Sequence, residues 1–157
     1  ISCLDAHGQH QAMSDYQGQL LLVVNVASHC YFTRQYHELR ELYLKYHPRG
    51  LNILAFPCHQ FAKQEPDDAD VVEKHCQIHF DLPFPLMEKV KVNGPDTHPL
   101  FHYLKQQAPG LWGSRSIKWN FCKFLIPINR QNIERFAPMT TPSRLESYIH
   151  AQLRNTY

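Results

Sequence analysis

The sequence predicts an α/β protein with a mixed central sheet and helices on both faces. Apolar runs of strand length alternate with helical patterns over most of the chain, an order typical of parallel strands joined by right-handed crossovers. A hairpin pattern near the C-terminus then adds antiparallel strands. The 157 residues, 43% of them hydrophobic, are expected to form a single domain over residues 1–157.

In chain order the expected elements are a strand over 20–26, a helix from 33 that stops at Pro48 and Gly50, a strand over 51–56, a short helix in 68–80, a strand in 84–92, a helix in 98–107, a hairpin that turns at 129–132 and a helix in 141–153.

The first three elements have the clearest patterns. The strand LLLVVNV is apolar on both faces, as in a sheet that is covered on both sides. In the helix that follows, aromatic and leucine side chains recur at helical spacing from Tyr36 to Tyr46, and Thr33 is a suitable N-cap. The next strand, LNILAF, ends at Pro57.

The later elements depend on shorter signals. DADVVEKHCQIHF is a helical pattern, and FPLMEKVKV is read as a third strand before the turn NGPD. HPLFHYLKQQ carries Pro99 near its first turn, where proline is favoured. The stretch NFCKFLIPINRQNIERFAP predicts the hairpin, and a Thr-Pro pair opens the last helix, TPSRLESYIHAQL.

Composition excludes several classes of function. The net charge of +2 is too small to indicate a nucleic-acid partner. No apolar run approaches the roughly 20 residues of a membrane helix, so we expect no membrane insertion. Five cysteines, an odd number, fit a reducing compartment better than a disulfide scaffold. We therefore expect a cytoplasmic protein, or a periplasmic or organellar one if a leader preceded Ile1.

Cys30 follows the first strand and lies within one turn of a predicted helix start. Functional groups collect beyond the carboxyl ends of strands in open α/β sheets, and a helix N-terminus favours a thiolate. Gln60 follows the parallel second strand, and Trp119 and Asn120 precede the hairpin. A thiol among neutral hydrogen-bonding side chains suits attack by a thiolate in a polar pocket. The alternative is that Cys30 is a buried apolar cysteine.

Four motifs in this order, NVASHCYFT, LAFPCHQFAKQEP, FPLMEKVKVNG and IKWNFCKFL, resemble the glutathione peroxidase family over roughly residues 8–153. The resemblance implies a thioredoxin-like fold and the reduction of hydrogen peroxide and organic hydroperoxides. It places Cys30 at the peroxidatic position. Gln60, Trp119 and Asn120 fall on the other members of the family's catalytic tetrad.

Cys76 matches the resolving cysteine of the thioredoxin-linked branch of this family. The resemblance therefore implies thioredoxin as the reductant, with glutathione as the alternative, and no cofactor or metal. The short connection before IKWNF resembles that of the monomeric members. A redox sensor that passes oxidation to a partner protein would use the same two cysteines, and sequence does not separate these functions.

Some positions depart from the family pattern. Tyr31 and Ala62 stand where glycine is usual, and His59 stands where asparagine is usual. Tyr31 would be strained if its backbone required a positive φ. Cys58 is expected to be a packed core thiol. The stretch HCQIH, residues 75–79, also contains zinc-ligand types, but it lacks a fourth ligand at a recognisable spacing.

Overall fold

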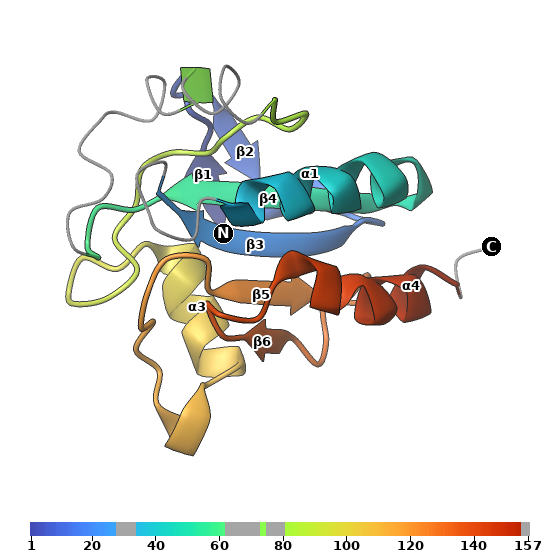
Figure 1. Ribbon diagram of the computed structural model, residues 1–157. Helices are drawn as coiled ribbons and strands as arrows, with labels where there is room; N and C mark the ends of the chain where they lie inside the picture. The colour runs from blue at the N-terminus through green and yellow to red at the C-terminus, as the bar shows by residue number, and fades with distance from the viewer. Residues whose placement is uncertain (28–33, 62–72, 75–80, 155–157) are drawn as a thin grey trace.

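A four-stranded sheet in the order β4–β3–β5–β6 forms the centre of the computed structural model (Figure 1). The structure describes residues 1–27, 34–61, 73–74 and 81–154. Its helices and strands are β1 (Ser2–Leu4), β2 (His10–Ala12), β3 (Leu20–Val26), α1 (Gln35–Tyr46), β4 (Leu51–Pro57), α3 (Pro99–Gln107), β5 (Lys123–Ile126), β6 (Glu134–Phe136) and α4 (Glu146–Arg154), with short 3₁₀ turns at Met13–Tyr16, His47–Arg49, Leu111–Gly113 and Pro142–Leu145.

The sheet is mixed, as predicted. β3 pairs in parallel with β4 and antiparallel with β5, which pairs antiparallel with β6. All seven residues of β3 are buried, which confirms that this strand lies in a sheet covered on both faces. Val26 lies opposite Pro57, so the carboxyl ends of β3 and β4 lie side by side.

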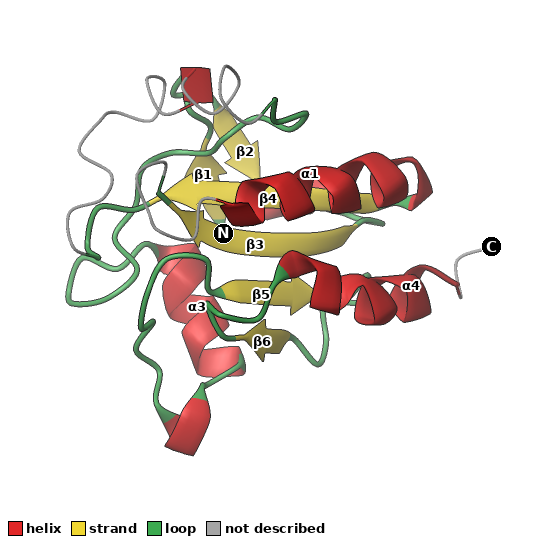
Figure 2. Cartoon of the chain, viewed as in Figure 1, coloured by secondary structure: helices red, strands yellow, loops and turns green. Residues whose placement is uncertain are grey.

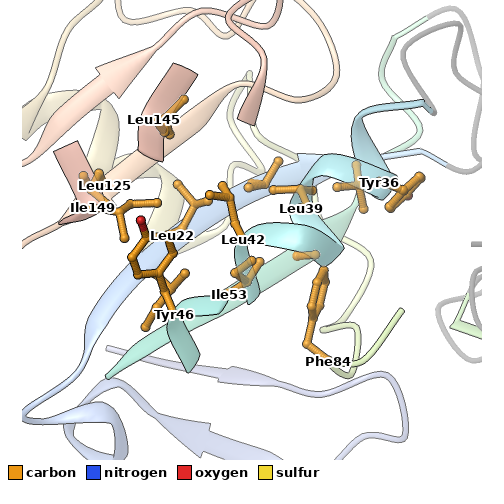
Figure 3. Close-up of a cluster of buried hydrophobic side chains, with 14 of the residues drawn as sticks. Leu22, Tyr36, Leu39, Leu42, Tyr46, Ile53, Phe84, Leu125, Leu145 and Ile149 are labelled. Carbon is orange, nitrogen blue, oxygen red and sulfur yellow. The ribbon is translucent and has the colours of Figure 1, made fainter. Parts of the chain in front are cut away.

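Helices α1 and α4 cover one face of this sheet (Figure 2). Leu39 and Leu42 of α1 and Ile149 of α4 pack with side chains of β3 and β4 such as Leu22 and Ile53 (Figure 3). Leu39 and Leu42 are three residues apart on α1, which places them on one face of the helix. Burial of this face stabilises the helix more than its intrinsic propensity does.

Helix α3 covers the opposite face. Its Phe101 and Leu104 share a buried cluster with Leu21 and Val23 of β3. The Phe101 ring also meets the ring of Phe56 edge-on, with centroids 5.4 Å apart. Alternate residues of β3 therefore enter two separate cores, one on each side of the sheet. Helices on both faces are thus confirmed.

Most predicted elements are present within the described residues, but the prediction of a strand in 84–92 is wrong. Leu86 makes one isolated bridge with Ala55, and Met87 makes one with Asp5. Pro85 has no N–H to donate to a ladder, and the N–H of Leu86 donates to the Glu73 carboxylate at 2.8 Å. Neither Pro85 nor Leu86 therefore offers an N–H for continuous strand pairing.

Two further outcomes concern the N-terminal half. The β1–β2 hairpin was not predicted, because its strands are only three residues long. Of the helix expected in 68–80, the structure describes residues 73–74, which are helical. Thr33, the predicted N-cap, lies outside the described residues. Across the part of the chain that is described, no helix has the length and apolar character needed to cross a membrane.

The packing of α1 generates a stability prediction. Leu39→Ala removes a side chain that is 0% exposed. It should lower the free energy of unfolding by about 2–5 kcal/mol, because the core cannot fill the cavity fully. Leu44→Ala, on the same helix at a position that is 47% exposed, should cost less than about 0.5 kcal/mol. Urea unfolding followed by circular dichroism measures both, and equal losses would contradict this assignment of the buried face.

Candidate active site

The candidate site lies where the carboxyl ends of β3 and β4 meet. The N–H of Cys58 donates to the carbonyl of Val26 at 2.9 Å, which extends the pairing of the two strands by one step. Gln60 follows directly on this edge. Cys30 and Cys76, the predicted peroxidatic and resolving residues, lie outside the described residues.

The loop that carries Trp119 and Asn120 is attached to the end of β3 by Asn25. The side-chain Nδ2 of Asn25 donates to the carbonyl of Trp119 at 3.1 Å. The backbone carbonyl of Asn25 accepts from the N–H of Phe121 at 2.6 Å. Asn25 is fully buried, so water does not compete for these bonds. The loop is therefore held at the same edge of the sheet as Gln60.

Phe121, next to Asn120, adopts a strained backbone. Its φ of 65° is in the left-handed region, which costs a bulky residue on the order of 1–3 kcal/mol. The side chain is fully buried, and its ring meets Tyr36 of α1 edge-on at 5.1 Å. Packing thus maintains a conformation that places Asn120, also fully buried, at the end of β3.

Trp119 is half-buried and packs beside the segment that follows β4. Its ring centroid lies 5.8 Å from that of Phe61, the residue after Gln60. The structure thus brings together the segments of three predicted site residues, Gln60, Trp119 and Asn120. They come from opposite halves of the chain and meet at the edge predicted from the strand order.

The carboxamide of Gln60 has a defined orientation. Its Oε1 accepts from the N–H groups of Val92 and Asn93 at 2.7 and 3.1 Å. Its Nε2 donates to the carbonyl of Asn93 at 2.9 Å. Because N–H groups only donate and carbonyls only accept, this pattern permits one amide orientation. The group that Gln60 still offers is the second N–H of Nε2, for which the described residues supply no acceptor.

The other cysteines that the structure describes are buried. Cys58 is 1% exposed, as expected for a packed core thiol. Burial raises the pKa of Cys3 to about 11, and burial also raises the pKa of the Cys122 thiol. Cys3 and Cys122 are therefore protonated near neutral pH and are poor nucleophiles.

The sequence patterns did not predict a role for several residues that lie near the site. Asn25 and Asn93 stand within the quoted motifs NVASHC and KVNG, but their long-range bonds have no local signal. Lys123 is fully buried and donates to the carbonyls of Pro138 and Ala137 at 3.0 and 3.5 Å. Desolvation by burial lowers its pKa to about 7.

The described residues contain no group of three His, Cys, Asp or Glu side chains placed to hold a metal ion. Residues 75–79, the zinc alternative, fall outside them. At His59, which stands beside Cys58, the ring Nδ1 is buried without a hydrogen-bond partner in the described part of the chain.

A cleft opens beside Trp119. It has a volume of about 860 Å³, and Pro109, Pro138 and Met139 contribute apolar walls. Lys118 and Arg135 also line it. Arg135 is itself engaged, because its guanidinium donates to the carbonyls of Arg115 and Ser116 at 3.2 and 2.7 Å.

Comparisons with known proteins show which family the chain is similar to. A family model described as glutathione peroxidase matches residues 1–105. Glutathione peroxidase-like peroxiredoxin 2 of Saccharomyces cerevisiae is 44% identical over 153 residues, which cover 98% of this chain and 94% of the relative. The crystal structure of T. cruzi GPX1 is similar with a TM-score of 0.80 and 36% identity, over 98% of this chain and 94% of that one.

A more distant structure bears on the fold alone. A thioredoxin family thiol:disulfide interchange protein from Chlorobium tepidum is 11% identical, with a TM-score of 0.70 over 98% of this chain and 92% of its own. These similarities confirm the thioredoxin-like fold that the sequence motifs implied.

The buried cation at Lys123 generates a pH prediction. Its pKa of about 7 lies below the roughly 10.4 of an unfolded lysine, so between these values the unfolded chain binds more protons. The free energy of unfolding should therefore rise from pH 7 to pH 8.5, by on the order of 1 kcal/mol. In Lys123→Met this rise should disappear. Urea unfolding at pH 7.0, 7.75 and 8.5 measures it, and equal slopes in both proteins would contradict the assignment.

Proposed function

The chain belongs to the glutathione peroxidase family, and we propose that within this family it reduces hydroperoxides with Cys30 as the peroxidatic thiol. Gln60, Trp119 and Asn120 stabilise the charge that develops on oxygen. Cys76 resolves the oxidised Cys30, and thioredoxin reduces the resulting disulfide. The observation that supports this most is the meeting of the Gln60 and Trp119–Asn120 segments at the end of β3, the strand that leads into Cys30.

The reaction takes place at sulfur and oxygen. The Cys30 thiolate attacks one oxygen of the hydroperoxide, so that an S–O bond forms as the O–O bond breaks. The leaving oxygen takes a proton and departs as water or an alcohol, and Cys30 becomes a sulfenic acid. The Cys76 thiol then attacks the Cys30 sulfur, which forms a disulfide and releases water. A dithiol of thioredoxin restores both thiols by exchange.

Thiolate formation alone does not account for fast peroxide reduction. A thiol with the ordinary pKa near 8.5 is about 3% thiolate at pH 7, so a lower pKa gains at most about 30-fold. The remaining acceleration must come from groups that stabilise the leaving oxygen and deliver a proton to it. Neutral N–H donors suit the first of these tasks because they stabilise negative charge without a change in their own protonation. The proton that the leaving oxygen takes up comes from solvent water.

Gln60 fits the role of a donor. Its Oε1 is occupied by two backbone N–H groups, so an N–H of Nε2 is what it presents to a substrate. The indole N–H of Trp119 and the carboxamide of Asn120 are further donors of the same neutral kind. A site of this composition favours peroxide reduction over reactions that need a titrating acid–base pair.

The cleft beside Trp119 supports organic hydroperoxides as substrates in addition to hydrogen peroxide. A volume of about 860 Å³ with apolar walls accommodates a hydrocarbon chain, which hydrogen peroxide alone would not require. We propose that the organic part of the substrate occupies this cleft while its peroxide group reaches the thiolate.

Thioredoxin is preferred to glutathione as the reductant because Cys76 supplies the second thiol of a two-cysteine cycle.

The alternative function is a redox sensor, in which a partner protein instead of thioredoxin receives the oxidation. We propose a monomer because the short connection before Ile117 resembles that of the monomeric members of the family. We propose a cytoplasmic location because an odd number of cysteines, five, fits a reducing compartment.

Cys30→Ser should abolish peroxide-dependent consumption of NADPH in a coupled assay with thioredoxin and thioredoxin reductase, because no other thiol replaces the nucleophile. Cys3→Ala is the matched control, since burial keeps Cys3 protonated with a pKa of about 11. It should retain the parental rate within about twofold. A Cys30→Ser protein that turns over at the parental rate would refute the proposed nucleophile.

Cys76→Ser should permit one oxidation of Cys30 and then stall with thioredoxin, because no disulfide forms for thioredoxin to reduce. The assay is run with hydrogen peroxide and a lipid hydroperoxide, once with the thioredoxin system and once with glutathione and glutathione reductase. Sustained turnover of the variant with thioredoxin would rule out Cys76 as the resolving residue. A parental protein that works with glutathione alone would identify glutathione as the reductant.

A further inference from the structure

We propose that Asn93 is a positioning residue that joins the two halves of the active site and thereby sets the placement of the Gln60 and Trp119 donors. Its backbone is bound to the side chain of Gln60, and its side chain is bound to the backbone of Ile117, two residues before Trp119. The inference rests on the proposed function, in which Gln60 and Trp119 act on the leaving oxygen.

The first connection fixes Gln60. The carboxamide of Gln60 exchanges two hydrogen bonds with the backbone of Asn93, one in each direction, at 2.9 and 3.1 Å. Gln60 is exposed, so its side chain would otherwise sample several rotamers in water. The paired bonds select one rotamer and one amide orientation. The backbone at Val92 and Asn93 thereby determines where the remaining N–H of Gln60 points.

The second connection fixes the loop that leads to Trp119. Asn93 Nδ2 donates to the carbonyl of Ile117 at 2.7 Å, and Asn93 Oδ1 accepts from the N–H of the same residue at 2.9 Å. One side chain thus satisfies both polar groups of one peptide residue, as a neighbouring strand would. Ile117 is buried, which anchors the loop at this point.

A buried lysine attaches this bridge to a rigid element. Lys105 of α3 donates from Nζ to the carbonyl of Val92 at 2.6 Å and to Asn93 Oδ1 at 3.3 Å. Because Oδ1 accepts from a cation and from an N–H, the Asn93 amide also has one orientation. The neighbours of Lys105 on α3, Leu104 and Phe101, lie in the core. The bridge is therefore fixed relative to the sheet.

This arrangement matters for the reaction because donors act only where the oxyanion forms. A displacement of about 1 Å can cost on the order of 100-fold in rate. Alkylation of Cys30 by iodoacetamide provides a contrast, since iodide leaves without a proton or a hydrogen-bond donor. A positioning role predicts that loss of Asn93 slows oxidation much more than alkylation. A purely structural role predicts that both rates change together.

The test compares two second-order rate constants on the peptide that contains Cys30, measured by quench and mass spectrometry in the full chain. Asn93→Ala keeps the backbone groups that bind Gln60 but removes the side-chain bonds to Ile117 and Lys105, so that the backbone that orients Gln60 is no longer tied to the Trp119 loop. The rate of oxidation by hydrogen peroxide should then fall by about 10- to 100-fold. The rate of alkylation by iodoacetamide at the same pH should change by less than about threefold. An unchanged ratio of the two rates in a folded Asn93→Ala protein would overturn the proposal.

Thr97→Ala is the matched control. Its hydroxyl donates to the carbonyl of Gly94 at 2.6 Å within the same loop and does not reach Ile117. The ratio of rates should stay within about threefold of the parental value. If Asn93→Ala does not fold, Lys105→Met carries the test, because it removes the cation that orients Asn93. In Lys105→Met the ratio of the oxidation rate to the alkylation rate should fall by about threefold or more. An unchanged ratio would again refute the positioning role of Asn93.

The proposed function fails in a different way. If Cys30→Ser consumes hydroperoxide as fast as the parental protein, Cys30 is not the nucleophile and the proposed function itself is wrong. If Cys30→Ser is inactive and Asn93→Ala retains the parental ratio of rates, the peroxidase assignment stands and only the positioning role of Asn93 is refuted.

Discussion

The hydrogen bonds of Asn25 at the end of β3 are the constraint on which the rest of the site depends. The residue is fully buried, and it holds the carbonyl of Trp119 and the N–H of Phe121. β3 is the central strand, paired on both sides, so its end is among the least mobile points of the fold. A loop attached there takes its position from the core, and the Gln60 segment reaches the same edge through the parallel register of β3 and β4.

The site that results is built from neutral amides with fixed orientations. Gln60 is oriented by two backbone N–H groups, and Asn93 is oriented by a backbone N–H and the ammonium of Lys105. Fixed dipoles need little reorganisation when charge develops, which is the main advantage of such donors over water. The charged group Lys105 acts one step away from the proposed chemistry, where it orients the Asn93 side chain.

Strand order and local pattern were sufficient to predict the central sheet and the edge at which the site lies. They failed over residues 84–92, where Pro85 and the bond from Leu86 to Glu73 prevent a ladder that the apolar pattern suggests. They also failed at Asn93, because its partner Ile117 is 24 residues away and a side-chain pairing at that range leaves no periodic signal. Elements that depend on periodic burial are predictable, and single long-range amide pairs are not.

The strain near the site is offset by packing elsewhere. Phe121 adopts a left-handed backbone, and Lys123, two residues later, has a fully buried amino group with its pKa lowered to about 7. Both are destabilising features, and both follow Asn120 closely in the chain, Phe121 within the turn and Lys123 at the start of β5. The edge-on contact of Phe121 with Tyr36 joins that turn to α1, the helix that follows the Cys30 segment in the chain. The two apolar cores on either side of β3 therefore stabilise a local geometry that the loop alone would not adopt.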